Sequence, residues 1–253
     1  MRILRALIFV LAQGLATPVY ALLMILSAPF GVRGPRYFAG AWSRLMLVLA
    51  RWICGIHHEI SGWEHLPSGP FVLVAKHQST WETIFFPAFL PPHVFVLKQE
   101  ILSIPFFGWG MRLLEPIAID REQRREAFQQ VLSQGRERLS RGLIVIIFPE
   151  GTRVPYGYRG RYAPGGGLLA VQAGVPVVPL AHDAGRLWQK GMLGKYPGTI
   201  HLSLGPVLST EGREGIEVNQ EAEAWIEAEL ERWSHQPAHP WRRKHNKRGS
   251  VIR

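Results

Sequence analysis

His77 and Glu82 are the pair of residues whose types and spacing most clearly suggest chemistry. A neutral imidazole can take a proton from an alcohol near pH ~7 when a carboxylate holds its tautomer and stabilises the imidazolium. Five positions on one helix would turn the two side chains roughly 140° apart, so the pair fits a strand-to-helix junction better. Residues 71–75 form an apolar run typical of a buried strand, and residues 79–82 match the S/T-x-x-E start of a helix. The spacing predicts a base and its carboxylate at a helix start or, as the alternative, a capping box beside an ordinary loop histidine.

A second cluster of polar residues, at 148–153, follows another apolar run at 143–147. That run is typical of an interior strand, and ligand sites in α/β folds gather where such strands end. Gly151 allows the backbone to approach a ligand, and Arg153 offers a planar fork suited to phosphate oxygens. The pattern indicates an anion site, with a plain turn carrying a surface Arg–Glu pair as the alternative.

Together the two blocks resemble the glycerolipid acyltransferase family, which includes the 1-acylglycerol-3-phosphate acyltransferases. The family's first block is a histidine, four residues and an acidic residue, and His77 and Glu82 match it with glutamate in place of the more frequent aspartate. Its later blocks resemble residues 98–121, 148–153 and 175–180, in the same order. The resemblance implies an α/β fold with a mixed central sheet flanked by helices.

The resemblance also implies a reaction. His77 would remove the proton from the free hydroxyl of 1-acylglycerol 3-phosphate (lysophosphatidate), and the oxygen would attack an acyl thioester to give phosphatidate in phospholipid biosynthesis. The donor would be a thioester of acyl-carrier protein or of coenzyme A, acting as a co-substrate, with no cofactor. Two alternatives are an acyltransferase for another lysophospholipid or an aminolipid, and a non-catalytic membrane lipid-binding module with the same fold.

Site residues follow from the same resemblance. Glu82 would hold the His77 ring, and Arg153 would pair with the acceptor phosphate. The other residues implied in substrate binding are Glu150, Gly151 and Thr152 around the acceptor, with Lys98 and Arg121 adding positive potential.

One position departs from the family pattern. A lysine often found shortly after the third block is replaced here by Ala163. Arg159 and Arg161 lie close in sequence. They either compensate for that lysine or are solvated loop arginines.

The net charge and the cysteine count limit the classes of binding partner that we expect. The formal net charge of +10 favours an anionic membrane, a phosphorylated lipid and an acidic acyl donor. No nucleic acid partner is expected, because no helix-turn-helix, zinc-finger or RNA-binding signature accompanies the charge. Cys54 is the single cysteine, so no intrachain disulfide or thiolate cluster can form, and no metal site is expected.

The N-terminal region, residues 1–58, is predicted to be a membrane-associated helical anchor. Residues 7–26 are apolar and, at ~1.5 Å per residue, long enough to cross a ~30 Å hydrocarbon core. Pro18 is expected to kink this segment, and a second apolar segment carries Arg44 and Arg51 on one helix face. We therefore expect a helical hairpin or kinked anchor, with the catalytic part facing the cytoplasm at the inner membrane if the protein is bacterial.

The rest of the chain is predicted to form an acyltransferase domain at 59–236 and a basic tail at 237–253. The tail could attract anionic lipid by about 1 kcal/mol per basic residue, or be solvated. The helices expected from periodicity lie at 122–140, 168–173 and 219–233, and the further strands at 175–180 and 199–204.

Overall fold

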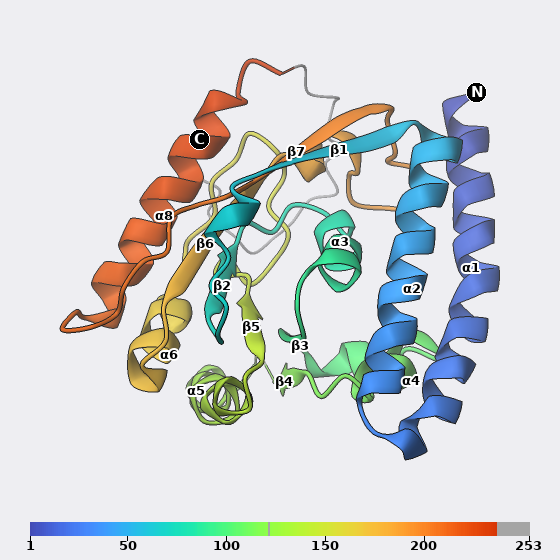
Figure 1. The fold of residues 1–253 in the computed structure, drawn as a ribbon. Coiled ribbons are helices and arrows are strands. Elements are labelled where there is room, and N and C mark those ends of the chain that lie inside the picture. Colours follow the sequence, from blue (N-terminus) through green and yellow to red (C-terminus); the bar gives the residue numbers. More distant parts are fainter. Residues whose placement is uncertain (121, 237–253) are drawn as a thin grey trace.

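A mixed seven-stranded sheet forms the centre of the molecule, as the resemblance implied (Figure 1). The computed structural model describes residues 1–120 and 122–236. The strands are β1 (Ile56–Ser61), β2 (Val72–Ala75), β3 (His93–Lys98), β4 (Ile117–Ile119), β5 (Ile144–Ile147), β6 (Val177–His182) and β7 (Gly198–Leu204). They lie in the order β1-β7-β6-β2-β5-β3-β4, and every pair is parallel except β6 with β7. The carboxyl ends of β6, β2, β5, β3 and β4 therefore share one edge of the sheet.

Helices cover both faces of this sheet (Figure 1). They are α1 (Arg2–Ser27), α2 (Arg33–Leu49), α3 (Trp81–Phe89), α4 (Phe107–Arg112), α5 (Arg124–Ser140), α6 (Gly165–Ala173), α7 (Ala184–Leu187) and α8 (Gly215–Arg232). The helices α5, α6 and α8 lie on one side of the sheet, and α1, α2 and α3 on the other. The central strand β2 is buried on both sides: Leu73 joins the core beneath α1–α3, and Val72 joins the core beneath α5, α6 and α8.

The helix α6 begins earlier than the expected residue 168, at Gly165. Three consecutive glycines have low helix propensity, so periodicity alone places the start too late. Close packing explains them: a Cβ on Gly167 would lie 2.0 Å from the carbonyl oxygen of Gly215 at the start of α8. The tertiary contact between α6 and α8 therefore overrides local propensity.

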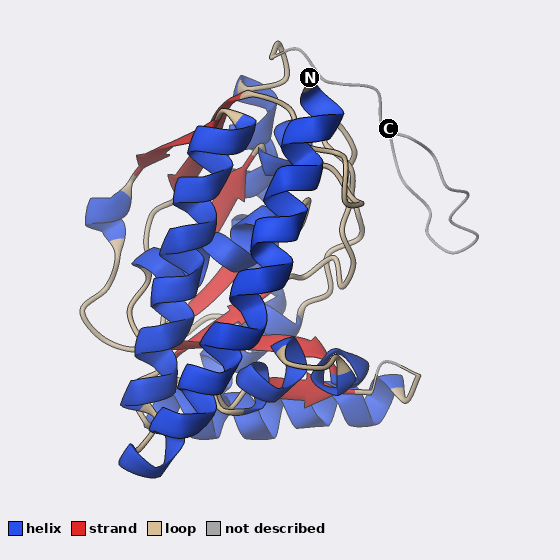
Figure 2. Cartoon of the chain, turned by 90° about the vertical axis from the view of Figure 1, so that its right-hand side faces the viewer, coloured by secondary structure: helices blue, strands red, loops and turns tan. Residues whose placement is uncertain are grey.

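The helices α1 and α2 form the expected hairpin and lie side by side across one face of the sheet (Figure 2). Phe9 and Met46 are fully buried in the same core as Leu73, so the hairpin is continuous with the sheet domain. The strand β1 begins at Ile56 and includes His57 and His58. The expected boundary between the anchor and the acyltransferase domain, at residue 58, therefore falls inside a strand that pairs with β7.

The helix α1 continues through Pro18 from Arg2 to Ser27. With the following turn it is the one segment of the described residues that is long and apolar enough to cross a membrane. Its outward face exposes the large apolar side chains Leu4, Leu7, Leu11, Leu15, Val19, Leu22 and Leu26.

The two arginines of the second apolar segment have different surroundings. Arg44 donates to the carbonyl oxygen of Ala88 at the end of α3, 3.4 Å away, whereas Arg51 is exposed. Arg51 lies in a π-helical turn, Ala50–Cys54, which follows directly after α2.

Candidate active site

The loop of residues 76–80, which we name the catalytic loop after the role expected of His77, joins the end of β2 to the start of α3. His77 Nδ1 lies 2.8 Å from Glu82 Oε1, as the spacing of the two residues predicted. A carboxylate can only accept, so Nδ1 carries the proton and Nε2 is the ring nitrogen that can receive one. The ring stacks on Phe148 with 4.1 Å between ring centroids. Phe148 follows β5, which pairs with β2, and this pairing brings the two sequence blocks together.

Glu82 is fully buried in α3, and its Oε1 also accepts from the backbone N–H groups of Gln78 (2.9 Å) and Ser79 (2.8 Å). Burial opposes ionisation of this carboxyl. The nearby His182 ring and the hydrogen bond from His77 outweigh that effect and hold the pKa of Glu82 below its ordinary 4.5. A negative Glu82 can therefore stabilise a protonated His77 ring at neutral pH.

Residues 79–82 form a cap-like arrangement that begins one residue before Thr80, the N-cap of α3, which itself makes no side-chain cap hydrogen bond. Ser79 Oγ accepts from the N–H of Trp81 at 3.1 Å, and Glu82 accepts from the N–H of Ser79. This reciprocal arrangement is close to a capping box, and the same Glu82 oxygen holds the His77 ring. The helix start thus aims the carboxylate at the imidazole.

Glu150 lies inside the protein rather than in a binding cavity. Its side chain is fully buried and accepts from Lys76 Nζ (2.9 Å), the N–H of His77 (3.2 Å) and the N–H of Gly160 (3.0 Å). Lys76 is also fully buried, and its Nζ lies 2.8 Å from Glu227 of α8. Burial raises the pKa of Glu150, and Lys76 with the two backbone donors offsets only part of that effect. Both oxygens of Glu150 contact protein donors, so this residue supports the catalytic loop from within.

The rest of the third block forms a turn beside His77. Gly151 has φ +64°, a conformation that favours glycine, and its N–H donates to the carbonyl oxygen of Phe148. Thr152 is exposed, and the N–H of Val154 donates to the carbonyl oxygen of His77 at 2.8 Å. The side chain of Arg153 lines the cavity next to His77 and makes no hydrogen bond or ion pair within the described part of the chain.

The other expected cations have different surroundings. Lys98, at the end of β3, lines the same cavity and pairs with Glu100. Arg121 lies outside the described residues. Arg159 pairs with Glu223 of α8 at 2.6 Å, and Arg161 is exposed away from the cavity lining. Lys98 and Arg153 are thus the cations that line the cavity among residues 1–120 and 122–236.

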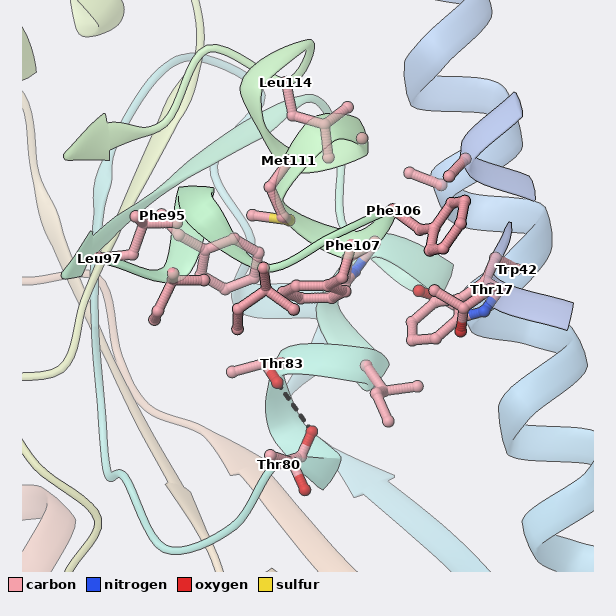
Figure 3. A pocket seen from close by; sticks show the side chains of 18 of the residues that line it. Thr17, Trp42, Thr80, Thr83, Phe95, Leu97, Phe106, Phe107, Met111 and Leu114 are labelled. Carbon is pink, nitrogen blue, oxygen red and sulfur yellow. Dashed lines mark hydrogen bonds between the residues drawn. The ribbon is translucent and has the colours of Figure 1, made fainter. Parts of the chain in front are cut away.

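An apolar cavity of about 390 Å³ opens beside His77, between the hairpin and the sheet. Its wall is mostly apolar and includes Ala21 and Met24 of α1, Trp42 of α2, Ile84 of α3, Phe95 and Leu97 of β3, and Phe107, Gly110 and Met111 of α4. Figure 3 shows Trp42, Phe95 and Phe107 turned toward the same space from three elements. Its volume lies in the range of small-molecule sites, and its wall suits a hydrocarbon chain.

Sequence reasoning missed two features of this site. The cavity is built by segments far apart in the chain, so no local pattern indicates it. Lys76 and His182 received no role, although each is a charged or titratable residue at the end of an otherwise apolar buried strand. That position is a usable signal, because such residues are rarely buried unless they are paired. Within the described ranges, no group of three or more His, Cys, Asp and Glu residues is arranged to hold a metal ion.

Comparisons with known proteins place this geometry in context. Residues 57–183 match the sequence profile of the family described as Acyltransferase. The 1-acyl-sn-glycerol-3-phosphate acyltransferase of Pseudomonas aeruginosa is 47% identical over 218 residues, which cover 84% of each chain. The mouse 1-acyl-sn-glycerol-3-phosphate acyltransferase alpha is 31% identical over 195 residues, covering 75% of this chain and 68% of the mouse protein. The crystal structure of the 1-acyl-sn-glycerophosphate acyltransferase of Thermotoga maritima shares the fold, with a TM-score of 0.76 at 23% identity over 94% of this chain and 100% of that one.

Proposed function

Because the chain belongs to the acyltransferase family, we propose that it moves a fatty acyl group from a thioester donor to the free hydroxyl of 1-acylglycerol 3-phosphate, giving phosphatidate. One observation carries the proposal. A histidine with its tautomer set by a buried glutamate lines the same apolar cavity as an arginine whose side chain has no hydrogen-bond or ion-pair partner among the described residues. The reaction needs a base for the acceptor hydroxyl, a cation for the acceptor phosphate and an apolar site for the acyl chain, and these three features supply them.

The chemistry uses His77 twice. Nε2 takes the proton of the acceptor hydroxyl as its oxygen attacks the thioester carbonyl. The tetrahedral intermediate then collapses: the carbon–sulfur bond breaks, and the leaving sulfur takes the proton from the imidazolium. Glu82 stabilises the imidazolium between these two steps, through the hydrogen bond from Nδ1.

Arg153 is proposed to bind the acceptor phosphate. A guanidinium presents two parallel N–H groups that match phosphate oxygens, and Lys98 adds a second positive charge on the same wall. Thr152, exposed beside Arg153, is available to a ligand, while Glu150 acts through the loop backbone.

The cavity is proposed to hold the chain being transferred. Both candidate carriers, acyl-carrier protein and coenzyme A, are water-soluble, so a chain attached to them needs an apolar site at the moment of transfer. The acceptor is a membrane lipid, and its own chain can stay in the bilayer. Either carrier fits this proposal.

The membrane is proposed to meet the outward face of α1 and the segment Ile104–Trp109, where Ile104, Phe106 and Trp109 are exposed. The hairpin contacts the domain near both of its ends: Arg2 donates to the carbonyl oxygen of Leu193, and Met24 lies against Gly110. These contacts lie roughly 33 Å apart along α1, a distance similar to the thickness of the hydrocarbon core of a bilayer. A helix held this way suits the interface of one leaflet, with the catalytic part on the cytoplasmic side.

Depth measurement tests that placement. A fluorophore on Leu15→Cys, in a Cys54→Ala background, should be quenched by nitroxides near the lipid glycerol level. Quenching that is strongest at the bilayer centre would show instead that α1 spans the membrane.

An acceptor panel tests the reaction itself. Purified protein is assayed with acyl-coenzyme A and acyl-carrier protein against lysophosphatidate, other lysophospholipids, an aminolipid and dephosphorylated monoacylglycerol. We expect phosphatidate as the main product. Faster transfer to another acceptor would support the alternative lipid acyltransferase, and no transfer to any acceptor would support a non-catalytic lipid-binding module.

Arg153→Ala sharpens the phosphate assignment. The variant should raise KM for lysophosphatidate by roughly 10-fold or more, as expected for loss of a charge-assisted pair, and change transfer to monoacylglycerol little. Arg161→Ala, an exposed arginine away from the cavity, is the matched control. Equal losses with both acceptors would assign Arg153 a structural role.

A further inference from the structure

The segment His182–Trp188, which comprises the end of β6 and the helix α7, supports the catalytic loop from the side opposite Phe148 to Val154. The order of strands explains this, because β2 lies between β5 and β6. Three hydrogen bonds join the segment to the loop. His182 Nε2 lies 2.8 Å from the carbonyl oxygen of Lys76, the N–H of Gly185 donates to Gln78 Oε1 at 3.0 Å, and Ser79 Oγ donates to the carbonyl oxygen of Trp188 at 2.6 Å. They flank His77 on both sides along the chain.

The His182 ring uses both of its nitrogens inside the protein. Nδ1 accepts from the N–H of Ala184 at 3.3 Å, so Nε2 is the donor to the Lys76 carbonyl oxygen. Its side chain is fully buried, which excludes contact with substrate. Nε2 also lies 3.8 Å from Glu82 Oε1, too far for a hydrogen bond. The ring therefore lies behind the His77–Glu82 pair and holds the peptide that precedes His77.

We propose that His182 is a positioning residue for His77, acting through the hydrogen bond from its Nε2 to the Lys76 carbonyl oxygen. The inference rests on the proposed role of His77 as the base. The His77 backbone is held on the β5 side by Glu150 and Val154, and the bond from His182 fixes the adjoining peptide from the β6 side. Both supports set where the His77 ring meets Glu82. A shift of about 1 Å in a reacting group can cost on the order of 10²-fold in rate, so such a support has a measurable kinetic effect.

A purely structural His182 would fill space in the core and affect stability alone. The two amide side chains separate that role from positioning. In His182→Gln the side-chain nitrogen can reach the place of Nε2 and keep the bond to Lys76. In His182→Asn the shorter amide reaches only the place of Nδ1, so that bond is lost.

The experiment measures kcat and KM for both substrates, per folded enzyme, in His182→Gln and His182→Asn. We expect His182→Gln to keep kcat within about 3-fold, and His182→Asn to lower kcat by roughly 10- to 100-fold with both KM values unchanged. Equal kcat in both variants, whether lowered or normal, would overturn the proposal.

Gly185→Ala provides an independent variant on the same segment. A Cβ there would lie 2.9 Å from Gln78 Cβ, so the loop must shift, and kcat should fall while KM holds. Gly14→Ala, where a Cβ meets nothing within 4 Å, is the control and should leave kcat unchanged. A normal kcat in folded Gly185→Ala would contradict the proposal.

His77→Ala in the same assay separates the two proposals. Loss of transfer in His77→Ala together with a normal kcat in His182→Asn would reject positioning and keep the base. Retained transfer in His77→Ala would reject the base, and the positioning role with it.

Discussion

The catalytic loop and the apolar cavity meet at His77, but they are held by different forces. The loop is fixed by directional hydrogen bonds from Glu82, Glu150 and the segment His182–Trp188, whereas the cavity is shaped by the volumes of apolar side chains from five elements. Hydrogen bonds specify position, and apolar packing specifies size. Changes in the loop should therefore alter how fast the enzyme works, and changes in the cavity should alter which acyl chains it accepts.

Two buried glutamates near His77 differ in the direction in which their pKa values shift. Glu82 has a lowered pKa, and Glu150 a raised one, although both are fully buried. Glu150 shares its single cation, Lys76, with Glu227. Burial alone thus does not decide the direction in which the pKa of a carboxyl shifts; the balance between desolvation and the neighbouring charges and donors does.

The largest effect is expected from Glu82→Gln. The amide keeps an oxygen for the backbone donors but removes the charge that stabilises the protonated His77 ring, so kcat should fall on the order of 10²-fold or more. Steady-state kinetics measures this, with Glu223→Gln, whose carboxylate pairs with the exposed Arg159, as the control. A Glu82→Gln enzyme within a few-fold of wild type would show that the charge is not needed.

Gly110→Leu should reduce the space in the cavity and so change which acyl chains the enzyme accepts. Even a Cβ at this position would lie 3.1 Å from Met24 Sδ, so a larger side chain must enter the cavity. We expect kcat/KM to fall roughly 10-fold or more for long-chain donors and little for short ones, in line with the cost of a few excluded methylenes. Competition between donors of two lengths measures the ratio, with Gly14→Leu as the control. An equal loss for both lengths would mean that the loop, not the cavity, was disturbed.

A fall in pH should lower the thermal stability of the wild-type protein more than that of Glu82→Gln. The folded pKa of Glu82 lies below the ordinary 4.5, so its contribution to stability is present above 4.5 and is lost as pH falls through the folded pKa. Thermal unfolding in detergent between about pH 6 and about pH 3.5 should therefore show the difference in Tm between the two proteins shrinking toward acid. A constant difference across that range would argue against a lowered pKa.

The smallest effect is expected at the position that departs from the family pattern. Ala163 is exposed, outside the cavity lining, and its N–H donates to the carbonyl oxygen of Pro149. Ala163→Lys should change the acceptor KM by no more than about 2-fold, as for an ordinary surface substitution. A marked drop in KM would show instead that a cation here reaches the phosphate and that Arg153 does not act alone.

The pairing of His77 with Glu82 was predictable because both residues belong to one short motif that straddles a strand end and a helix start. The meeting of that motif with Phe148 followed from two buried apolar runs, which became the neighbouring strands β2 and β5. Local sequence holds this information, since strand ends and helix caps are set by residues a few positions apart.

The burial of Glu150 was not predictable in the same way. Its partner Lys76 precedes His77, and Glu227, which also pairs with Lys76, lies 151 positions beyond Lys76 on α8. Only the tertiary fold brings these charges together. The cavity is a similar case, because α1, α2 and α4 contribute apolar residues that, in sequence, differ in no way from membrane-facing or core residues.

The most direct test of the central claim, that His77 is the base, is the rate of acyl transfer to lysophosphatidate by folded His77→Ala. The exposed neighbour of the hairpin, His57→Ala, serves as the matched control. The account predicts a fall on the order of 10²–10⁴-fold for His77→Ala and a normal rate for the control. A His77→Ala enzyme that transfers acyl groups within a few-fold of the wild-type rate would contradict it.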